Sequence, residues 1–142
     1  MKKFEFRLNR VRDWRILQLR MEQLKLQQLQ AEIVSLQDRK ETIQRERALA
    51  LTQTQRAGGI LGYELAAMEK YRIAASAKAA QFDKEMAAIH GLIQSQMTAL
   101  TERRRAVRAL ENLEAESRRE WHAALDREIQ IESDELALRA RL

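Results

Sequence analysis

The stretch Ala57-Gly58-Gly59-Ile60-Leu61-Gly62 decides the fold, because it is the one credible break in a chain that otherwise has the character of a helix. Three of the four glycines fall in this stretch, and the chain contains no proline. Glycine adopts positive φ without a steric penalty and weakens a helix interior, so clustered glycines favour a turn. We therefore predict that the chain reverses direction at 57–62.

The composition on both sides of this stretch is typical of long helices. Ala (21), Leu (19), Glu (16), Gln (13) and Lys plus Arg (26) make up 95 of the 142 residues, and these types lose little freedom in a helix. A β-sandwich or an α/β enzyme would need more β-branched and turn residues. We predict an all-α fold, a long antiparallel two-helix coiled-coil hairpin. It would form a single domain over 1–142, with helices at 4–56 and 63–140.

Apolar residues recur at coiled-coil spacing on both arms of the predicted hairpin. Before the glycines, the seam has a period of 3.5 residues and comprises Leu29, Ile33, Leu36, Ile43 and Ala50. A related stripe nearer the start is slightly out of phase and comprises Leu8, Val11, Leu17, Met21 and Leu24. After the glycines the same rhythm is carried by Tyr71, Ala75, Phe82, Met86, Ile89, Ile93 and Leu100, and less regularly by Val107, Leu110, Trp121, Leu125 and Leu136.

The arms are unequal in length, which leaves two pairings open. A turn near residue 60 pairs position 8 with about 112, and the second arm then extends roughly 35 Å beyond the first at helical rise. Pairing Trp14 with Trp121 instead moves the midpoint to about 67, with a short helix within 57–80. We favour one long second helix with an overhang.

Charge is distributed unevenly along the chain. Residues 1–20 hold seven basic and two acidic groups, whereas 126–135 hold five acidic groups and one basic group. A hairpin would lay these ends side by side, so the pattern favours a monomeric hairpin over a parallel dimer, although each exposed pair stabilises little. The alternative, in which the heptads pair between two chains, would be decided by the mass in solution.

The sequence offers little for catalysis. The two histidines are 32 residues apart, cysteine is absent, and the glycines are not followed by the Gly-Lys-Ser/Thr of a phosphate loop. Glu132, Asp134 and Glu135 do not share one helix face and are better explained as a solvated acidic surface. We predict no enzyme activity, no catalytic residue, no metal, no cofactor and no small-molecule substrate.

Two binding functions remain as alternatives. Arg103, Arg104, Arg105 and Arg108 form the densest basic cluster, but interleaved acidic residues and the lack of a known motif argue against nucleic acid. The segment from Phe4 to Met21 is basic and amphipathic and could rest on an anionic membrane surface. No apolar run approaches the roughly 18 residues of a membrane span. A basic coiled-coil scaffold for membrane or nucleic acid is therefore the alternative reading.

The two ends of the chain resemble the flagellar export protein FliJ family. Phe4-Glu5-Phe6-Arg7-Leu8-Asn9-Arg10-Val11 is similar to the F-x-F-x-L-x-x-V start of that family. Glu132-Ser133-Asp134-Glu135-Leu136-Ala137 is similar to its ending, where an Asp-Glu pair precedes an apolar residue and Ala. The length, the glycine-marked middle and the lack of proline and cysteine also fit.

The resemblance implies a stalk of the bacterial flagellar type III export apparatus, similar to the γ subunit of a rotary ATPase. Its partners would be the hexameric export ATPase, the membrane export gate protein and export chaperones, in the cytoplasm at the inner membrane. The residues implied at the ATPase are Phe4, Phe6, Leu8, Val11, Asp134, Glu135 and Leu136. Tyr63 and Tyr71, near the glycines, are the candidates for the export gate. The equivalent stalk of a virulence-type secretion system is a related alternative.

Overall fold

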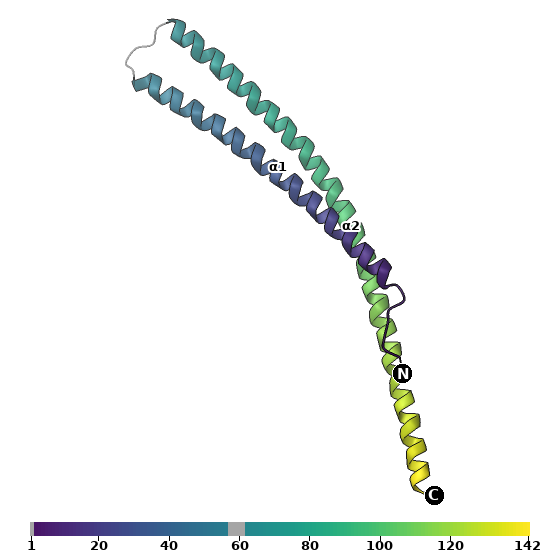
Figure 1. Ribbon diagram of the computed structural model, residues 1–142. Coiled ribbons are helices and arrows are strands. Elements are labelled where there is room, and N and C mark those ends of the chain that lie inside the picture. Colours follow the sequence, from purple (N-terminus) through teal and green to yellow (C-terminus); the bar gives the residue numbers. More distant parts are fainter. Residues whose placement is uncertain (1, 57–61) are drawn as a thin grey trace. The chain divides into compact units, whose positions relative to one another are not determined.

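The chain folds into two long α-helices, α1 (Asn9–Arg56) and α2 (Gly62–Ala140), in a computed structural model that describes residues 2–56 and 62–142 (Figure 1). No strand occurs within these described ranges, and the predicted all-α helical hairpin is confirmed. The predicted turn lies mostly at 57–61, outside the described residues, and Gly62 is the first residue of α2. α1 begins at Asn9 rather than at residue 4.

The chain divides into two compact units, and each contains part of both helices. Unit 1 consists of Met1–Glu22 and Ala99–Leu142, and unit 2 consists of Gln23–Thr98. Because α1 and α2 each run through both units, every unit holds an antiparallel helix pair of its own. Each pair buries one stripe of side chains per helix, as a coiled coil does.

In unit 2, the described parts of α1 and α2 run side by side in opposite directions (Figure 1). Leu36 on α1 and Ala75 on α2 are buried, and Lys40 pairs with Asp83 at 2.7 Å. Lys40 occupies a seam position, so its aliphatic stem lies along the seam while its ammonium group reaches the carboxylate at the edge. The seam predicted from Leu29 to Ala50 is therefore the packed face.

In unit 1, residues 9–22 of α1 and the residues before them lie against α2. Phe6, Leu100 and Val107 are buried. The side chain of Arg103 on α2 donates a hydrogen bond to Gln18 on α1 at 3.1 Å, and Arg12 forms an ion pair with Glu114. These contacts place position 12 opposite 114, close to the pairing expected for a turn near residue 60.

The predicted N-terminal stripe points the wrong way. Val11, Leu17, Met21 and Leu24 are between 44% and 57% exposed, and only Leu8 of that stripe is half-buried. The inner face uses Arg12, Arg15, Ile16 and Leu19 instead. The 3.5-residue repeat of Leu29–Ala50 continues without a phase change back to Leu8, and polar residues with long stems occupy several of its positions.

The expected charge pairing between the chain ends is also wrong. Every residue from 126 to 142 is exposed, so the acidic stretch 126–135 lies past the part of α2 that the N-terminal segment covers. We call residues 126–142 the C-terminal extension.

α2 is one uninterrupted helix, as favoured over a short helix within 57–80, and the overhang is this extension. Among the described residues, no helix is long and apolar enough to cross a membrane.

The seam predicts that two leucines on α2 differ strongly in how much they stabilise the fold. Leu100 is 5% exposed and Leu92 is 56% exposed. We expect Leu100→Ala to lower the free energy of unfolding by about 2 kcal/mol or more, because it removes buried methyl groups and leaves a cavity. The matched control Leu92→Ala should change it by less than about 0.5 kcal/mol. Urea unfolding followed by circular dichroism checks both, and equal effects would contradict the assigned seam.

Candidate functional site

The residues before α1 hold the N-terminus on α2 through an aromatic cluster. The indole nitrogen of Trp121 donates a hydrogen bond to the carbonyl of Lys2 at 3.2 Å. Phe4 packs against Trp121 with a centroid distance of 6.0 Å and an interplanar angle of 61°, and Phe6 is buried. We call Lys2, Phe4, Phe6, Arg118 and Trp121 the N-terminal clasp.

Several weak interactions act together in the N-terminal clasp. The guanidinium carbon of Arg118 lies 4.7 Å from the centroid of the Phe4 ring, which is the geometry of a cation–π contact. The edge-to-face arrangement of Phe4 and Trp121 is a favoured one for aromatic rings. The Asn9 amide donates to the Phe6 carbonyl at 3.1 Å, which fixes the turn into α1. The F-x-F part of the N-terminal motif is therefore an anchor for the chain end.

The ion pair between Arg12 and Glu114 joins the two helices beside the clasp. Its hydrogen bond lowers the pKa of the Glu114 carboxyl below the ordinary 4.5, with the charge of Arg12 adding to the effect. The same bond raises the pKa of the Arg12 guanidinium. Arg118 also approaches Glu114, at 3.6 Å, so one carboxylate connects α1 with the clasp.

The C-terminal extension offers an exposed helix with apolar and acidic side chains. Its large apolar residues are all exposed and comprise Ile129, Ile131, Leu136, Leu138 and Leu142. Gln130 donates a hydrogen bond to Asp134 at 2.9 Å and Arg127 donates one to the Ala123 carbonyl at 3.2 Å, both along the helix itself. An exposed amphipathic helix of this kind is the form in which helices dock into the apolar grooves of other proteins.

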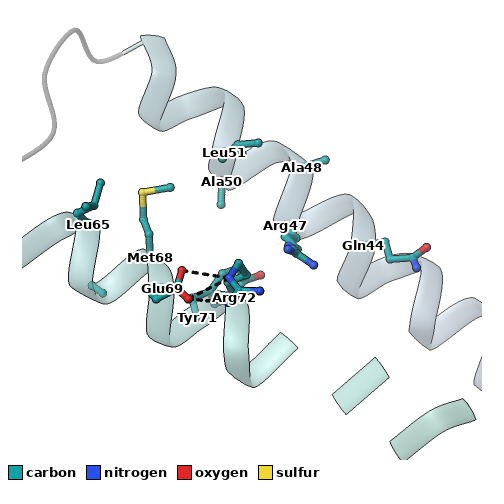
Figure 2. Close-up of a pocket in the computed structure, with 11 residues that line it drawn as sticks. Gln44, Arg47, Ala48, Ala50, Leu51, Leu65, Met68, Glu69, Tyr71 and Arg72 are labelled. Atoms are coloured by element: carbon teal, nitrogen blue, oxygen red, sulfur yellow. Dashed lines mark hydrogen bonds and ion pairs between the residues drawn. The ribbon is translucent and has the colours of Figure 1, made fainter. Parts of the chain in front are cut away.

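Unit 2 carries a groove between α1 and α2 near the end of the unit that contains Gly62. It encloses about 740 Å³. Figure 2 shows Met68 of α2 extending toward α1, where Ala50 and Leu51 lie. The residues that line the groove are Gln44, Arg47, Ala48, Ala50, Leu51, Leu65, Ala67, Met68, Glu69, Tyr71 and Arg72. Its floor is mostly apolar, so it suits an apolar side chain or a helix of a partner.

One side of this groove is charged and internally paired. Arg72 donates to both oxygens of Glu69, at 2.6 Å and 3.0 Å for the nearest contacts. This hydrogen bond lowers the pKa of the Glu69 carboxyl, and the charges of Arg72 and Arg47 add to the shift. Two cations, Arg47 and Arg72, and one carboxylate, Glu69, line the groove, so its charged groups sum to +1 and most of its surface is apolar.

The described residues do not assemble a metal centre. No group of three or more His, Cys, Asp or Glu side chains within 2–56 and 62–142 is placed to hold a metal ion. His122 packs edge-to-face on Trp121 with a centroid distance of 4.9 Å. No protein-family model, no curated protein and no solved structure matches the chain.

The structure separates the residues that the FliJ resemblance implies at the ATPase. Phe4, Phe6 and Leu8 are covered to different degrees at the clasp, and Val11 is exposed on α1. The other three (Asp134, Glu135 and Leu136) are exposed on the C-terminal extension. Residue 134 is 13 positions beyond Trp121, which is about 20 Å along a helix. The two motifs thus lie in one unit without touching.

The two tyrosines near the glycines differ in their surroundings. Tyr71 lines the groove of unit 2, whereas Tyr63 is exposed and does not line it. The basic cluster is also divided, because Arg103 is half-buried against Gln18 while Arg104, Arg105 and Arg108 are exposed.

Sequence reasoning missed Arg118 and Met68. Arg118 gave no signal, because an arginine over a phenylalanine ring depends on a register that the sequence leaves open. Met68 lies one heptad before Ala75 at seam spacing, and this signal could have identified it.

The depressed pKa of Glu114 predicts a pH-dependent contribution to stability. A carboxyl whose pKa is lower in the folded state stabilises the fold above its unfolded pKa, and this stabilisation is lost as the pH falls through the folded value. We expect Glu114→Gln to lower Tm at pH 7, and the difference from the parent chain to shrink as the pH falls below the ordinary carboxyl pKa of 4.5. The exposed Glu116→Gln should change Tm little at either pH. A Glu114→Gln difference that stays constant from pH 7 to pH 3 in thermal circular dichroism would exclude this role.

Proposed function

We propose that the protein is a non-enzymatic stalk and coupling component of the bacterial flagellar type III export apparatus. In this role it binds the hexameric export ATPase, promotes assembly of the ring, and links it to the membrane export gate and to export chaperones. It would act in the cytoplasm, peripherally associated with the inner membrane. The resemblance of both chain ends to the FliJ family is the reason for naming this apparatus.

The observation that carries the proposal is the C-terminal extension of unit 1. A helix with exposed Ile131, Leu136 and Leu138 and with acidic neighbours has no partner among the described residues of its own chain. A stalk that enters a ring needs such an exposed helix, and it needs no enclosed pocket. Electrostatic complementarity between the charged end and the ring would guide the encounter.

The N-terminal clasp supports the same proposal by a different route. The clasp fixes Phe4 on Trp121 of α2 and Phe6 is buried, so we infer that the F-x-F motif holds the base of the extension to the rest of unit 1. We therefore assign the motif residues two roles. Phe4, Phe6 and Leu8 position the extension, whereas Val11, Asp134, Glu135 and Leu136 supply accessible side chains for the ATPase.

The groove of unit 2 is the surface that suits the export gate. Tyr71 combines a large ring with a polar tip, and aromatic residues of this kind often dominate binding energies at interfaces. Ala67 and Met68 provide the apolar floor beside it. A gate segment with an apolar side chain would fill the groove, while Tyr63 offers a second exposed ring on α2.

Binding to the ATPase gives the direct test of the proposal. The purified chain should bind the cognate hexameric export ATPase and raise its rate of ATP hydrolysis. Asp134→Lys with Glu135→Lys should weaken this binding at least tenfold, since it reverses two accessible charges at the proposed contact. The matched control is Glu85→Lys, an exposed carboxylate on α2 in unit 2. The absence of binding by the parent chain at low salt would refute the proposed function.

The groove of unit 2 yields a separate prediction about the export gate. Tyr71→Ala should lower the affinity for the cytoplasmic part of the export gate protein about tenfold, because losing an interface hot spot costs more than about 1 kcal/mol. Ile73→Ala serves as the control, since Ile73 is exposed on α2 outside the groove. Calorimetry or surface plasmon resonance measures both. Equal affinities for the two variants would remove the groove from the gate interface.

A further inference from the structure

In unit 1, α1 carries a second apolar face, on the side away from α2. Trp14, Leu17 and Met21 are exposed there, with Val11 at its edge. The inner face is formed by Leu8, Arg12, Arg15, Ile16 and Leu19. At 100° per residue, Trp14, Leu17 and Met21 point to nearly the opposite side from Leu19. We call Trp14, Leu17 and Met21 the outer stripe.

The spacing of the outer stripe favours a helix as its partner. Trp14, Leu17 and Met21 are separated by 3 and 4 residues, which is the repeat of a coiled-coil seam. A flat surface would not select this spacing, because a broad apolar face serves equally well there. The α1 segment of unit 1 thus has two seams, and only the inner one is occupied by α2.

On the C-terminal extension, the seam positions of α2 continue but no other helix covers them among the described residues. The half-buried positions of α2 include Leu110, Ser117 and Ala124 at intervals of seven residues. Ile131 and Leu138 continue this interval but are 59% and 62% exposed. The seam of α2 therefore runs on for two heptads beyond the point where its own chain covers it.

The charges of these two surfaces are complementary. Arg7 and Arg10 lie at the N-terminal end of the outer stripe and are exposed. Residues 126–135 hold five acidic groups and one basic group, and all are exposed. The hairpin does not bring the acidic stretch to the basic end of its own chain, so the attraction between them is unused within one molecule.

We propose that a second copy of this chain occupies the outer stripe, through its C-terminal extension. The extension of each chain lies on the outer stripe of the other, so the pair is symmetric and both surfaces are used twice. This isologous arrangement is the commonest way in which two identical chains associate. The proposal does not depend on the proposed function.

The order of residues fixes the direction of this contact. Along α1, the basic Arg7 and Arg10 precede the apolar Leu17 and Met21. Along the extension, the acidic stretch 126–135 precedes the apolar Leu138. A parallel contact matches charge with charge and apolar with apolar, whereas an antiparallel contact would set acidic groups against apolar ones.

A two-fold axis perpendicular to the helices, which makes the two chains antiparallel, is consistent with the same direction. In each chain, α2 and its extension run opposite to α1. When the second chain is reversed relative to the first, the extension of one chain therefore runs in the same direction as the α1 segment of the other. The α1 residues of unit 1, 9–22, and the extension residues up to Ala140 are similar in length, each about 20 Å of helix. Each α1 segment would then lie between its own α2 and the partner's extension.

The dimer would also cover residues that the proposed function uses. Asp134, Glu135 and Leu136 lie on the extension, so a paired chain could not offer them to an ATPase. Self-association would therefore compete with ring binding. Dissociation on dilution would release the stalk.

Sedimentation equilibrium across a range of chain concentrations tests the proposal. We expect the mass to rise from that of one chain to that of two, with a weaker association at high salt because charge contributes to it. Leu17→Glu and Leu138→Glu should each weaken dimerisation at least tenfold. Val34→Glu and Leu92→Glu, exposed apolar positions in unit 2, are the matched controls and should leave it unchanged. Circular dichroism verifies that all four variants keep their helices.

A disulfide experiment tests the contact itself, because the chain contains no cysteine. Mixing Leu17→Cys chains with Leu138→Cys chains under mild oxidation should give a covalent dimer of the two kinds. Leu17→Cys mixed with Leu92→Cys should give much less. Sites 17 and 138 cannot meet within one chain, since about 50 Å of helix separates residue 138 from the part of α2 near Arg103 that faces Gln18.

Three results would overturn the proposal. A mass of one chain at every concentration up to the millimolar range would do so. So would a dimer that Leu17→Glu and Leu138→Glu leave intact, since another surface would then hold it. The third is a single-chain mass in solution together with binding to vesicles of phosphatidylglycerol that Leu17→Glu abolishes, which would assign the outer stripe to a lipid surface. ATPase binding is measured separately, so either proposal can fail alone.

Discussion

A pair of helices can bury only one stripe of side chains on each, and the rest of the structure depends on this constraint. The described residues that are buried are few and comprise Phe6, Leu36, Ala75, Leu100 and Val107. Hydrophobic burial scales with the area removed from water, so stability must accumulate along the length of the seam rather than in a central core. Large apolar residues outside the seam, such as Trp14, Leu51 and Leu92, then remain exposed and available to partners.

The seam explains which parts of the fold the sequence could predict. Clustered glycines, helix-forming residues and the repeat from Leu29 to Ala50 were sufficient for two antiparallel helices and an overhanging second arm. The prediction that the N-terminal stripe is the packed face was wrong because it rested on apolar character alone. The inner face continues through Arg12 and Arg15, and long polar side chains at seam positions give no hydrophobic signal. The register could not be read from the sequence, because Arg12 opposite Glu114 is one of several acceptable pairings.

The candidate sites were predictable to a smaller extent. Motif position singled out Phe4, Phe6 and the acidic C-terminal stretch as contacts for one partner, but it did not indicate that Phe4 packs on α2 or that the two motifs lie about 20 Å apart in one unit. The clasp joins Phe4 to Trp121 and Arg118, residues more than 100 positions away in the chain. Such contacts arise from tertiary register, which composition and periodicity do not determine. The groove of unit 2 likewise depends on how α1 and α2 approach each other near Tyr71 and Met68.

The central claim is that the C-terminal extension is an unpartnered helix whose role is to dock. Amide hydrogen exchange measures this most directly, in the chain alone at low micromolar concentration and in the presence of the cognate export ATPase. The account predicts fast exchange at 126–142 in the free chain, because a helix without tertiary contacts opens easily, and at least tenfold slower exchange there in the complex. Slow exchange at 126–142 in the free monomer, or unchanged exchange there when the ATPase is bound, would contradict it.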